Sequence, residues 1–307
     1  MTLHGDELRI DLPLVRALVD RALPELRGRQ LRPLDASGSS NALFRLGEDL
    51  LVRLPRQPGG SEAIVKEARW LPYLTPALPV TIPEVVTVGE PDLAYPERWS
   101  VVRWIDGKSP DGPVVDGMAG GLALDLAAVV GALRELAVPL DALTDPALRG
   151  YRGEPLATMD ADFRQYLADC CTLPGLDLDL DACVRVWEAA MTLPNPTEGV
   201  APRWLHGDLL AENLLLGEIQ LTAVLDFGGL SVGDPTVDLV VGWEALDPSG
   251  RERFRSILGV DEVIWLRGRA WALAIAVMTF PYYWHTMPKR CAARLAMAHA
   301  VIDDAAS

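Results

Sequence analysis

Asp208, Asn213 and Asp226 are the residues of this 307-residue chain whose types and spacing best suit chemistry. Asp208 ends the run His206-Gly207-Asp208, Asn213 follows five residues later, and Asp226 opens the run Asp226-Phe227-Gly228. An aspartate can accept the proton of an attacking hydroxyl group, and aspartate and asparagine oxygens are ligands that Mg²⁺ prefers. The set therefore suits transfer of a phosphoryl group from a magnesium nucleotide to a hydroxyl.

The apolar residues between these side chains predict how they are positioned. Leu214–Leu216 and Leu221–Leu225 are short apolar runs separated by a turn that begins at Gly217-Glu218. Two such runs predict a hairpin, which would bring Asn213 and Asp226 to the same edge, where one cation can bridge them. Each polar residue alone would also fit an ordinary turn, but the order and spacing of the whole set favour a functional site. His206 is expected to fix the loop through hydrogen bonds.

The remaining sequence predicts an α+β protein with a change of character near residue 106. Before that point we expect one helix at 11–23, strands at 30–34, 42–46, 50–54, 83–89 and 99–105, and a helix at 61–73. After it we expect helices at 116–137, 160–170, 179–192, 236–245, 251–258, 261–279 and 288–303. We therefore predict a β-rich N-terminal lobe of residues 1–105 and a mostly α-helical C-terminal lobe of residues 106–307.

Composition narrows the class of protein. Half of the residues are hydrophobic, which indicates a globular fold, and the net charge of −15 disfavours a nucleic-acid partner. The four cysteines show no disulfide or zinc spacing, and the N-terminus shows no signal-peptide pattern. The longest apolar stretch, residues 270–284, is shorter than the roughly 20 residues that span a bilayer. We expect a cytoplasmic protein with no membrane contact and no obligate protein partner.

On these motifs the chain resembles the aminoglycoside phosphotransferase family of kinase-like small-molecule kinases, over nearly its whole length. The resemblance implies a bilobal protein-kinase-like fold, with Asp208 as catalytic base and Asn213 and Asp226 as metal ligands. It also implies that Asp234 and Asp238, in the segment after Gly233, brace the catalytic loop. Gly207 stands where protein kinases carry Arg, and no Ala-Pro-Glu segment follows, which favours a small acceptor over a protein.

The resemblance also assigns a nucleotide site to the N-terminal lobe. Arg53 occupies the strand position where the family often has Lys. The macrolide phosphotransferase branch resembles this chain in having an Arg there. Glu67 on the next helix would be the partner of Arg53. A guanidinium can bind phosphate in a bidentate manner. A polar loop at 37–41 would cover the phosphates through Ser39 and Ser40. Backbone groups of Arg103 and Ile105 would read the purine edge at the hinge between the lobes.

The expected activity is therefore an ATP- or GTP-dependent, Mg²⁺-requiring O-phosphotransferase acting on a small hydroxylated molecule. An aminoglycoside-type antibiotic is the first expected acceptor, and a macrolide or a metabolic acceptor of the homoserine, choline or sugar-amine type remains the alternative. From a different class, a nucleotide-binding pseudokinase module also remains open. The aromatic segment 271–285 would either wall the acceptor pocket or pack in the core, and the acidic residues of 154–181 would either meet substrate ammonium groups or form a solvated face.

Overall fold

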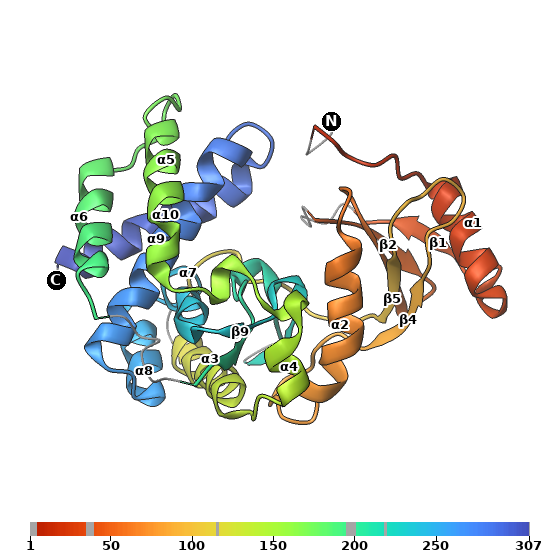
Figure 1. The fold of residues 1–307 in the computed structure, drawn as a ribbon, viewed down its shortest axis with the longest axis horizontal. Coiled ribbons are helices and arrows are strands. Elements are labelled where there is room, and N and C mark those ends of the chain that lie inside the picture. Colours follow the sequence, from red (N-terminus) through yellow and green to blue (C-terminus); the bar gives the residue numbers. More distant parts are fainter. Residues whose placement is uncertain (1–4, 35–39, 115–116, 195–200, 218–219, 307) are drawn as a thin grey trace. The chain divides into compact units, whose positions relative to one another are not determined.

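The computed structural model describes residues 5–34, 40–114, 117–194, 201–217 and 220–306 (Figure 1). By its internal contacts the chain forms two compact units. The first contains Met1–Pro76, Thr81–Gly107 and Leu225–Gly228, and the second contains Ala77–Val80, Lys108–Val224 and Gly229–Ser307. The segment with Asp226 thus belongs to the first unit, although the residues on both sides of it belong to the second.

The first unit is built on a five-stranded antiparallel sheet with strand order β1-β2-β3-β5-β4. Its elements are α1 (Leu12–Ala22), the 3₁₀ helix η1 (Pro24–Leu26), β1 (Leu31–Pro33), β2 (Asn41–Leu46), β3 (Leu50–Pro55), α2 (Ser61–Leu74), β4 (Val85–Gly89) and β5 (Trp99–Arg103). Gly47, in the left-handed region with φ 61°, turns β2 into β3, as the hairpin prediction required.

The alternation of side chains along β3 explains how this unit holds a charged group. Val52 and Leu54 belong to the hydrophobic cluster that α1 completes with Val15 and Leu18. Because successive strand residues point to opposite faces, Arg53 faces the other side of the sheet. Helix α2 covers that side, across the sheet from α1 (Figure 1). The strand pattern therefore directs Arg53 toward α2.

The second unit is mostly helical. Its helices are α3 (Gly117–Glu135), α4 (Leu140–Thr144), α5 (Asp160–Cys170), α6 (Leu180–Met191), α7 (Val241–Glu244), α8 (Pro248–Leu258), α9 (Glu262–Tyr283) and α10 (Pro288–Ala306). Short 3₁₀ helices connect them: η2 (Pro146–Leu148), η3 (Tyr151–Gly153), η4 (Leu156–Met159), η5 (Ala211–Asn213), η6 (Phe227–Gly229, which crosses into the first unit) and η7 (Pro235–Val240). Helix α9 is the centre of this unit, because α5, α6, α7, α10 and η7 all pack against it.

Helix α9 is long and apolar enough to cross a membrane by length and composition, but 72% of its apolar window is buried inside the structure. That burial is typical of the core helix of a soluble protein. The helix also continues through Pro281 to Tyr283, beyond the predicted end at residue 279. A proline has no N–H for the carbonyl of Val277, and the thiol of Cys170 donates to that oxygen instead, at 3.7 Å.

Two small two-stranded sheets hold the segment that bears the sequence motif. Strand β6 (Arg203–Leu205) pairs with β9 (Ser231–Gly233), and β7 (Leu214–Leu216) pairs with β8 (Leu221–Val224). The β7–β8 hairpin confirms the predicted strands, whereas its predicted turn at residue 218 lies outside the described residues. Leu214 pairs with Val224, so Asn213 precedes and Asp226 follows the same paired end of the hairpin.

Besides the end of α9, further elements differ from the sequence prediction. Residues 236–240 are a 3₁₀ helix, not the start of an α-helix, and α8 begins at Pro248, three residues early. Asp247 caps α8 by accepting from Gly250 N at 2.7 Å, so the pair Asp247-Pro248 was the start signal. The β6–β9 pairing was not predicted, since strands of three residues carry too little alternation to read.

Candidate active site

Gly207 shapes the backbone of residues 206–213, which the sequence predicts to be catalytic and which are called the catalytic segment below. Its φ of 77° lies in the left-handed region, and a Cβ atom added there would stand 2.3 Å from the carbonyl oxygen of Gly229. Contacts that short do not occur, so any larger residue would move one of the two backbones. The glycine that stands where protein kinases carry Arg is therefore fixed by the close approach of these two segments.

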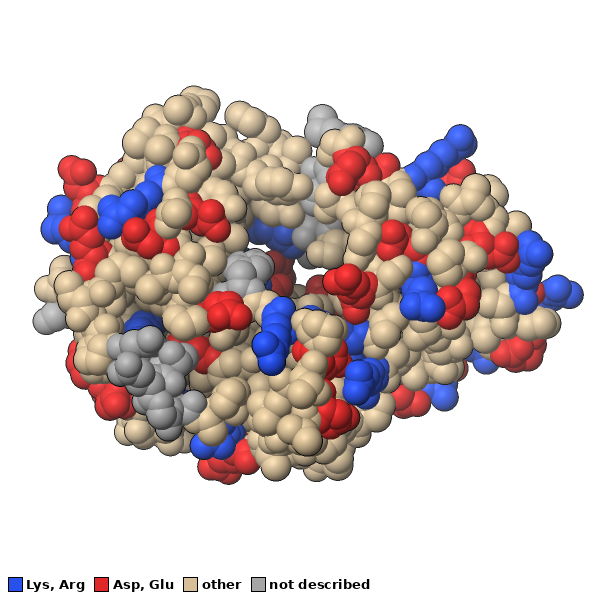
Figure 2. Space-filling view, viewed as in Figure 1, with Lys and Arg blue, Asp and Glu red and all other residues tan. Residues whose placement is uncertain are grey.

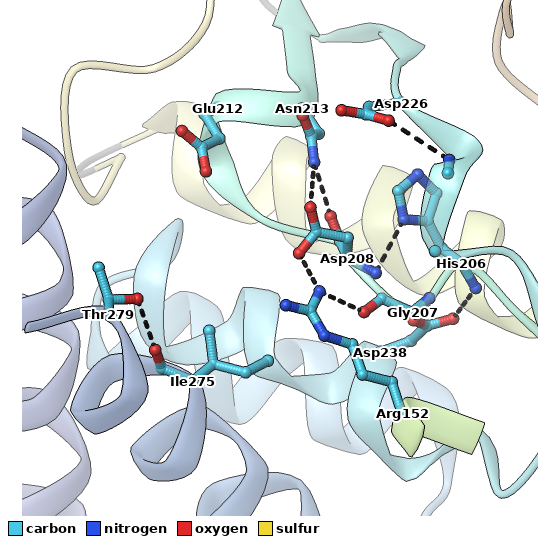
Figure 3. A network of polar contacts seen from close by, with 12 residues as sticks. Arg152, His206, Gly207, Asp208, Glu212, Asn213, Asp226, Asp238, Ile275 and Thr279 are labelled. Atoms are coloured by element: carbon cyan, nitrogen blue, oxygen red, sulfur yellow. Dashed lines mark hydrogen bonds and ion pairs between the residues drawn. The ribbon is translucent and has the colours of Figure 1, made fainter. Parts of the chain in front are cut away.

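Asp238 braces this segment from below (Figure 3). Its two carboxylate oxygens accept from the backbone N–H groups of His206 at 2.7 Å and of Gly207 at 2.8 Å. Burial raises the pKa of Asp238, which is 1% exposed, and outweighs the opposing effect of His206 and these N–H donors. His206 in turn accepts from the N–H of Asp208 through Nδ1, at 3.2 Å. The predicted bracing roles of Asp238 and His206 are confirmed.

Asp234 does not share that role, so the prediction for this residue is wrong. Its Oδ1 accepts from the N–H of Thr236 at 3.0 Å, which caps η7, and its own N–H donates to the carbonyl of Gly153 at 2.9 Å. The second carboxylate oxygen, Oδ2, is buried and has no hydrogen-bond partner in the described part of the chain.

Both oxygens of Asp208 accept hydrogen bonds from neighbouring side chains. Arg152 Nη1 donates to Oδ1 and also to the carbonyl of Gly207, the latter at 2.8 Å. Asn213 Nδ2 donates to Oδ2 at 3.2 Å and to the backbone carbonyl of Asp208 at 2.8 Å. Figure 3 shows the two donors on either side of the carboxylate. Asp208 is thereby held in one orientation.

Electrostatics keep Asp208 ionised. Burial raises the pKa of Asp208, but the charge and hydrogen bond of Arg152, with smaller help from His206 and Arg294, bring it below its ordinary value. The carboxylate is therefore charged at neutral pH and can accept a proton or a hydrogen bond from an approaching hydroxyl.

Arg152 was not predicted to be a site residue. It lies on η3, far from Asp208 in the sequence, and no motif marks it. The element is brought close by two glycines: a Cβ atom on Gly233 would stand 2.1 Å from the carbonyl of Gly153. This close contact between η3 and β9 places Arg152 beside the catalytic segment. In the sequence, it is indicated only by the two glycines, Gly153 and Gly233.

Glu212 fastens the same segment to the C-terminal helix α10. Its Oε2 accepts from Arg290 Nη2 at 2.9 Å and its Oε1 from Arg294 Nη2 at 2.8 Å. Arg294 also pairs with Glu244, whose Oε2 accepts from the N–H of Ala211 at 2.7 Å. The catalytic segment is thus anchored on both sides, by Asp238 and by α10.

The aromatic segment 271–285 is buried in one part and exposed in another. Trp271 and Phe280 are 1% and 0% exposed, so this part packs in the core. Tyr282 is 55% exposed, and the guanidinium of Arg290 lies over the ring of Tyr283, 5.1 Å from its centroid. Since Arg290 binds Glu212, the end of the aromatic segment adjoins the catalytic segment.

A second polar cluster lies in the first unit. The guanidinium of Arg53 binds both carboxylate oxygens of Glu67, at 2.5 and 3.2 Å, and its Nη2 lies 3.7 Å from Asp226 Oδ1. Burial lowers the pKa of Arg53, but the opposite charges of Glu67 and Asp226 together raise it by more. The net shift of the pKa is therefore upward, and the guanidinium stays cationic. This bidentate pair is largely shielded from water, since the side chains of Arg53 and Glu67 are 8% and 1% exposed.

Asp226 has a strained backbone for a residue with a side chain. Its φ is 56°, and the N–H of Gly228 donates to its Oδ1 at 3.3 Å. Left-handed non-glycine residues of this kind cluster at functional sites, where the surrounding structure holds them in place. The buried side chain of Phe227 supplies such an anchor at the next position.

Asn213, in the second unit, and Asp226, in the first unit, each keep one side-chain oxygen without a hydrogen bond from the described residues. Both hydrogens of the Asn213 amide group point toward Asp208, which leaves its Oδ1 free of hydrogen bonds from the described residues. Asp226 Oδ2 likewise accepts none from them. No cluster of three or more His, Cys, Asp or Glu suited to a metal is found in the described ranges. Each of these oxygens, taken by itself, is a hard donor of the kind that Mg²⁺ prefers.

The remaining residues of the predicted nucleotide site lie as follows. Ser39 is outside the described residues, and Ser40 is exposed, with its carbonyl accepting from Arg56 N at 2.8 Å. The backbone N–H of Arg103 donates to the carbonyl of Glu84 at 2.9 Å. The backbone of Ile105 forms no hydrogen bond with the described chain. Of the two expected purine readers, only Ile105 keeps a backbone N–H open.

Two acidic residues of 154–181, Asp160 and Asp179, contribute to helix structure. Asp160 binds Arg164 at 3.1 Å and Trp187 Nε1 at 2.8 Å, and Asp179 caps α6 by accepting from Ala182 N at 2.8 Å. On the face shown in Figure 2, acidic and basic side chains are interspersed. These observations favour a solvated, structural face for this region.

Comparison with known sequences identifies the chain. Residues 31–271 match the sequence model of the phosphotransferase enzyme family. The chain belongs to that family. No curated protein sequence matches it significantly. Its sequence motifs thus identified the family correctly.

Solved structures confirm the kinase-like fold. The complex of APH(2″)-IIIa with GDP and kanamycin has 20% sequence identity and a TM-score of 0.68, with 96% of this chain and 98% of that chain covered. The streptomycin–ATP complex of APH(2″)-IIa has 16% identity and a TM-score of 0.61, covering 95% and 99%. Macrolide 2′-phosphotransferase MphH from Brachybacterium faecium has 22% identity and a TM-score of 0.58, covering 95% and 97%.

Proposed function

We propose that this family member transfers the γ-phosphoryl group of ATP or GTP to a hydroxyl of a small molecule in the cytoplasm, and that the acceptor is an aminoglycoside-type antibiotic. The observation that carries the proposal is the Asp208 carboxylate, held ionised and oriented by Arg152 and Asn213. A fixed, charged carboxylate is what orients an attacking hydroxyl in this reaction class.

In the proposed reaction Asp208 accepts the hydroxyl proton as the acceptor oxygen forms its bond to the γ-phosphorus. The bond from that phosphorus to the bridging oxygen breaks, and the nucleoside diphosphate leaves with the electron pair. Because little covalent work falls to the protein in such a transfer, positioning accounts for most of the catalysis. The bracing of the loop by Asp238 and Glu212 supplies that rigidity.

The donor side is assigned to residues of the first unit together with Asn213 of the second. Arg53, fixed and kept cationic by Glu67, would steady the α- and β-phosphates. Asn213 and Asp226 would hold Mg²⁺, which when bound neutralises charge on the β- and γ-phosphates. The remaining nucleotide contacts are proposed to come from Ser39, Ser40, Arg103 and Ile105. Ile105 is favoured over Arg103 as the backbone donor to the base, because the N–H of Arg103 already donates to Glu84.

The acceptor class is supported by the two structural relatives solved with kanamycin and with streptomycin. Half-exposed aromatic side chains at the end of α9, joined through Arg290 to Glu212, would form one wall for the acceptor. A wall of this kind also suits a bulkier ring, and the macrolide enzyme among the relatives makes a macrolide the second candidate.

A nucleoside-diphosphate release assay tests the proposal. The enzyme is given ATP or GTP with Mg²⁺ and, separately, a panel of aminoglycosides, macrolides and hydroxylated metabolites such as homoserine and choline. We expect acceptor-dependent release with an aminoglycoside, and mass spectrometry should find one added phosphoryl group on it. Turnover only with a macrolide or a metabolite would overturn the acceptor assignment. Nucleotide binding with no turnover on any acceptor would favour a pseudokinase module.

A further inference from the structure

The segment 95–98, which leads into β5, holds the connection between β3 and α2 within the first unit. Tyr95 Oη donates to the carbonyl of Pro55, the last residue of β3, at 2.8 Å. The backbone N–H of Arg98 donates to Oγ of Ser61, the first residue of α2, at 2.7 Å. One short stretch of chain therefore contacts both the end of β3 and the start of α2.

Glu97 binds the start of α2 through both of its carboxylate oxygens. Oε1 accepts from the N–H of Gly59 at 2.9 Å, and Oε2 accepts from the N–H and the hydroxyl of Ser61, at 2.9 and 2.5 Å. Burial raises the pKa of Glu97, but the hydrogen bonds from Ser61 and Gly59 outweigh burial and bring the pKa below its ordinary value. Glu97 is therefore a buried, ionised carboxylate that binds three donors of one connection.

Helix α2 has no side-chain cap of its own. Its N-cap residue is Gly60, which has no side chain, so the first N–H groups of the helix need acceptors from elsewhere. Glu97 provides one for the N–H of Ser61, and its charge also interacts favourably with the dipole at a helix N-terminus. A Cβ atom on Gly60 would stand 2.3 Å from Cβ of Pro55, so the connection is tightly folded. Glu97 thus fixes the place at which α2 begins.

The turn that leads into the segment 95–98 is strained. Leu93 and Ala94 both lie in the left-handed region, with φ of 51° and 65°, although neither is a glycine. Asp92 and Tyr95 close the turn by exchanging backbone hydrogen bonds of 3.2 and 2.9 Å. Such conformations persist where the surrounding structure holds them, and they cluster at functional sites. The strain indicates that the position of this segment is set by its contacts and not by local preference.

The start of α2 determines where Glu67 lies. Glu67 follows Ser61 by six residues, so about 9 Å of helix separates the two along the axis. The Glu67 carboxylate binds Arg53 at 2.5 and 3.2 Å. Because such hydrogen bonds span only about 2.7–3.2 Å, a displacement of α2 by about 1 Å would break the bidentate geometry. The contacts of Glu97 therefore reach Arg53 through the helix.

We propose that Glu97 is a positioning residue for nucleotide binding. It fixes the start of α2 and thereby the Glu67 carboxylate, which orients the guanidinium of Arg53. This inference rests on the proposed function, in which Arg53 steadies the nucleotide phosphates. Since Glu97 acts through the Arg53–Glu67 pair, its loss weakens nucleotide binding only while that pair is present.

Isothermal titration of the full chain with ADP and with GDP, in the presence of Mg²⁺ and without an acceptor, tests the proposal. Glu97→Gln keeps the size of the side chain but places an amide N–H₂ group against the N–H of Gly59 or of Ser61. Ser61→Ala removes the hydroxyl and leaves both backbone donors to Glu97. The control is Glu90→Gln, which removes an exposed carboxylate that pairs with the side chain of Arg98.

We expect the nucleotide to bind about tenfold more weakly to Glu97→Gln and a few-fold more weakly to Ser61→Ala, with Glu90→Gln unchanged. The same substitutions are then made in a chain that carries Arg53→Met and Glu67→Leu, titrated at ligand concentrations high enough to saturate the weakest variant. There Glu97→Gln should change the affinity by less than about twofold, because the pair through which it acts is gone.

Two results would overturn the proposal. One is unchanged nucleotide affinity in Glu97→Gln, and the other is an equally large loss with and without the Arg53–Glu67 pair, which would show that Glu97 supports only the general fold. If Glu97→Gln does not fold, the same comparison made with Ser61→Ala decides. A wild-type chain that binds neither nucleotide would contradict the proposed function itself, whereas wild-type binding without a loss in Glu97→Gln would contradict this inference alone.

Discussion

Arg53 and Arg267 are both buried, at 6% and 4% exposure, yet their surroundings are opposite. Arg53 forms a bidentate pair with Glu67 and lies near Asp226, whereas Arg267 has no partner among the described residues and opens into a cavity. The pKa of Arg53 is raised and that of Arg267 is lowered. Within the described part of the chain, an arginine is therefore ion-paired in one place and without a hydrogen-bonded partner in the other.

The difference between Arg53 and Arg267 distinguishes two kinds of buried polar group, those with partners and those without. A fully paired polar cluster, such as Arg53 with Glu67 or Asp208 with Arg152 and Asn213, is preorganised to position a reactant. An unpaired buried group has unmet binding capacity, which a ligand can satisfy. Each of the following substitutions changes one side of this contrast.

The largest expected effect is on folding stability. Arg53→Met leaves the Glu67 carboxylate buried and unpaired, so we expect a loss of about 3–5 kcal/mol in the free energy of unfolding. Arg267→Met removes a charge that has no partner among the described residues, and we expect it to change stability by less than about 1 kcal/mol or to raise it. Urea unfolding in phosphate-free buffer measures both. Equal losses of unfolding free energy in Arg53→Met and Arg267→Met would contradict the proposed difference between the two arginines.

A double variant separates the structural from the functional part of Arg53. Arg53→Met combined with Glu67→Leu removes both charges, so stability should return to near the wild-type level while phosphoryl transfer stays low. Recovery of activity together with stability would show that Arg53 holds the fold and has no part in binding the nucleotide.

The next effect is on the rate of transfer. Asp238→Asn places an amide N–H₂ against the N–H of either His206 or Gly207, and we expect transfer to slow by about 10- to 100-fold as the loop shifts. The control is Asp247→Asn at the N-terminus of α8, where asparagine caps equally well and the rate should stay within about twofold. A normal rate in Asp238→Asn would show that the brace does not position Asp208.

The smallest expected effect is a change in pH dependence. Arg152 is the main group that lowers the pKa of Asp208 against the effect of burial, so Arg152→Gln should raise that pKa. Since the ionised carboxylate is the active form, the acidic limb of the kcat/KM profile should move to higher pH. Arg164→Gln should leave the profile unchanged. A profile that stays fixed in Arg152→Gln, or moves to lower pH, would contradict this assignment.

The sequence predicted the motif-bearing hairpin, most helices and the strands of the first unit, because these rest on local patterns and on spacing. Asp208, Asn213 and Asp226 were named from their order alone. Arg152 could not be found this way, since it reaches Asp208 only through the close packing of Gly153 on Gly233. That contact joins segments far apart in the chain.

The segment from Gly233 to Asp238 shows where a prediction from family resemblance fails. Asp234 and Asp238 look alike in the sequence, and both were expected to brace the catalytic loop. Only Asp238 does so, because η7 turns one aspartate toward His206 and Gly207 and leaves the other at the cavity wall. Side-chain direction in a 3₁₀ helix that was expected to be α-helical decides between them.

The central claim is that Asp208 is the base for transfer to an acceptor hydroxyl. The most direct measurement is the rate of phosphorylation of the best acceptor by wild type and Asp208→Asn, with exposed Asp162→Asn as the control and thermal unfolding to verify folding. We predict a loss of about 10²- to 10⁴-fold in kcat for Asp208→Asn, with nucleotide binding retained and Asp162→Asn unaffected. A folded Asp208→Asn variant that phosphorylates the acceptor at the wild-type rate would contradict the account.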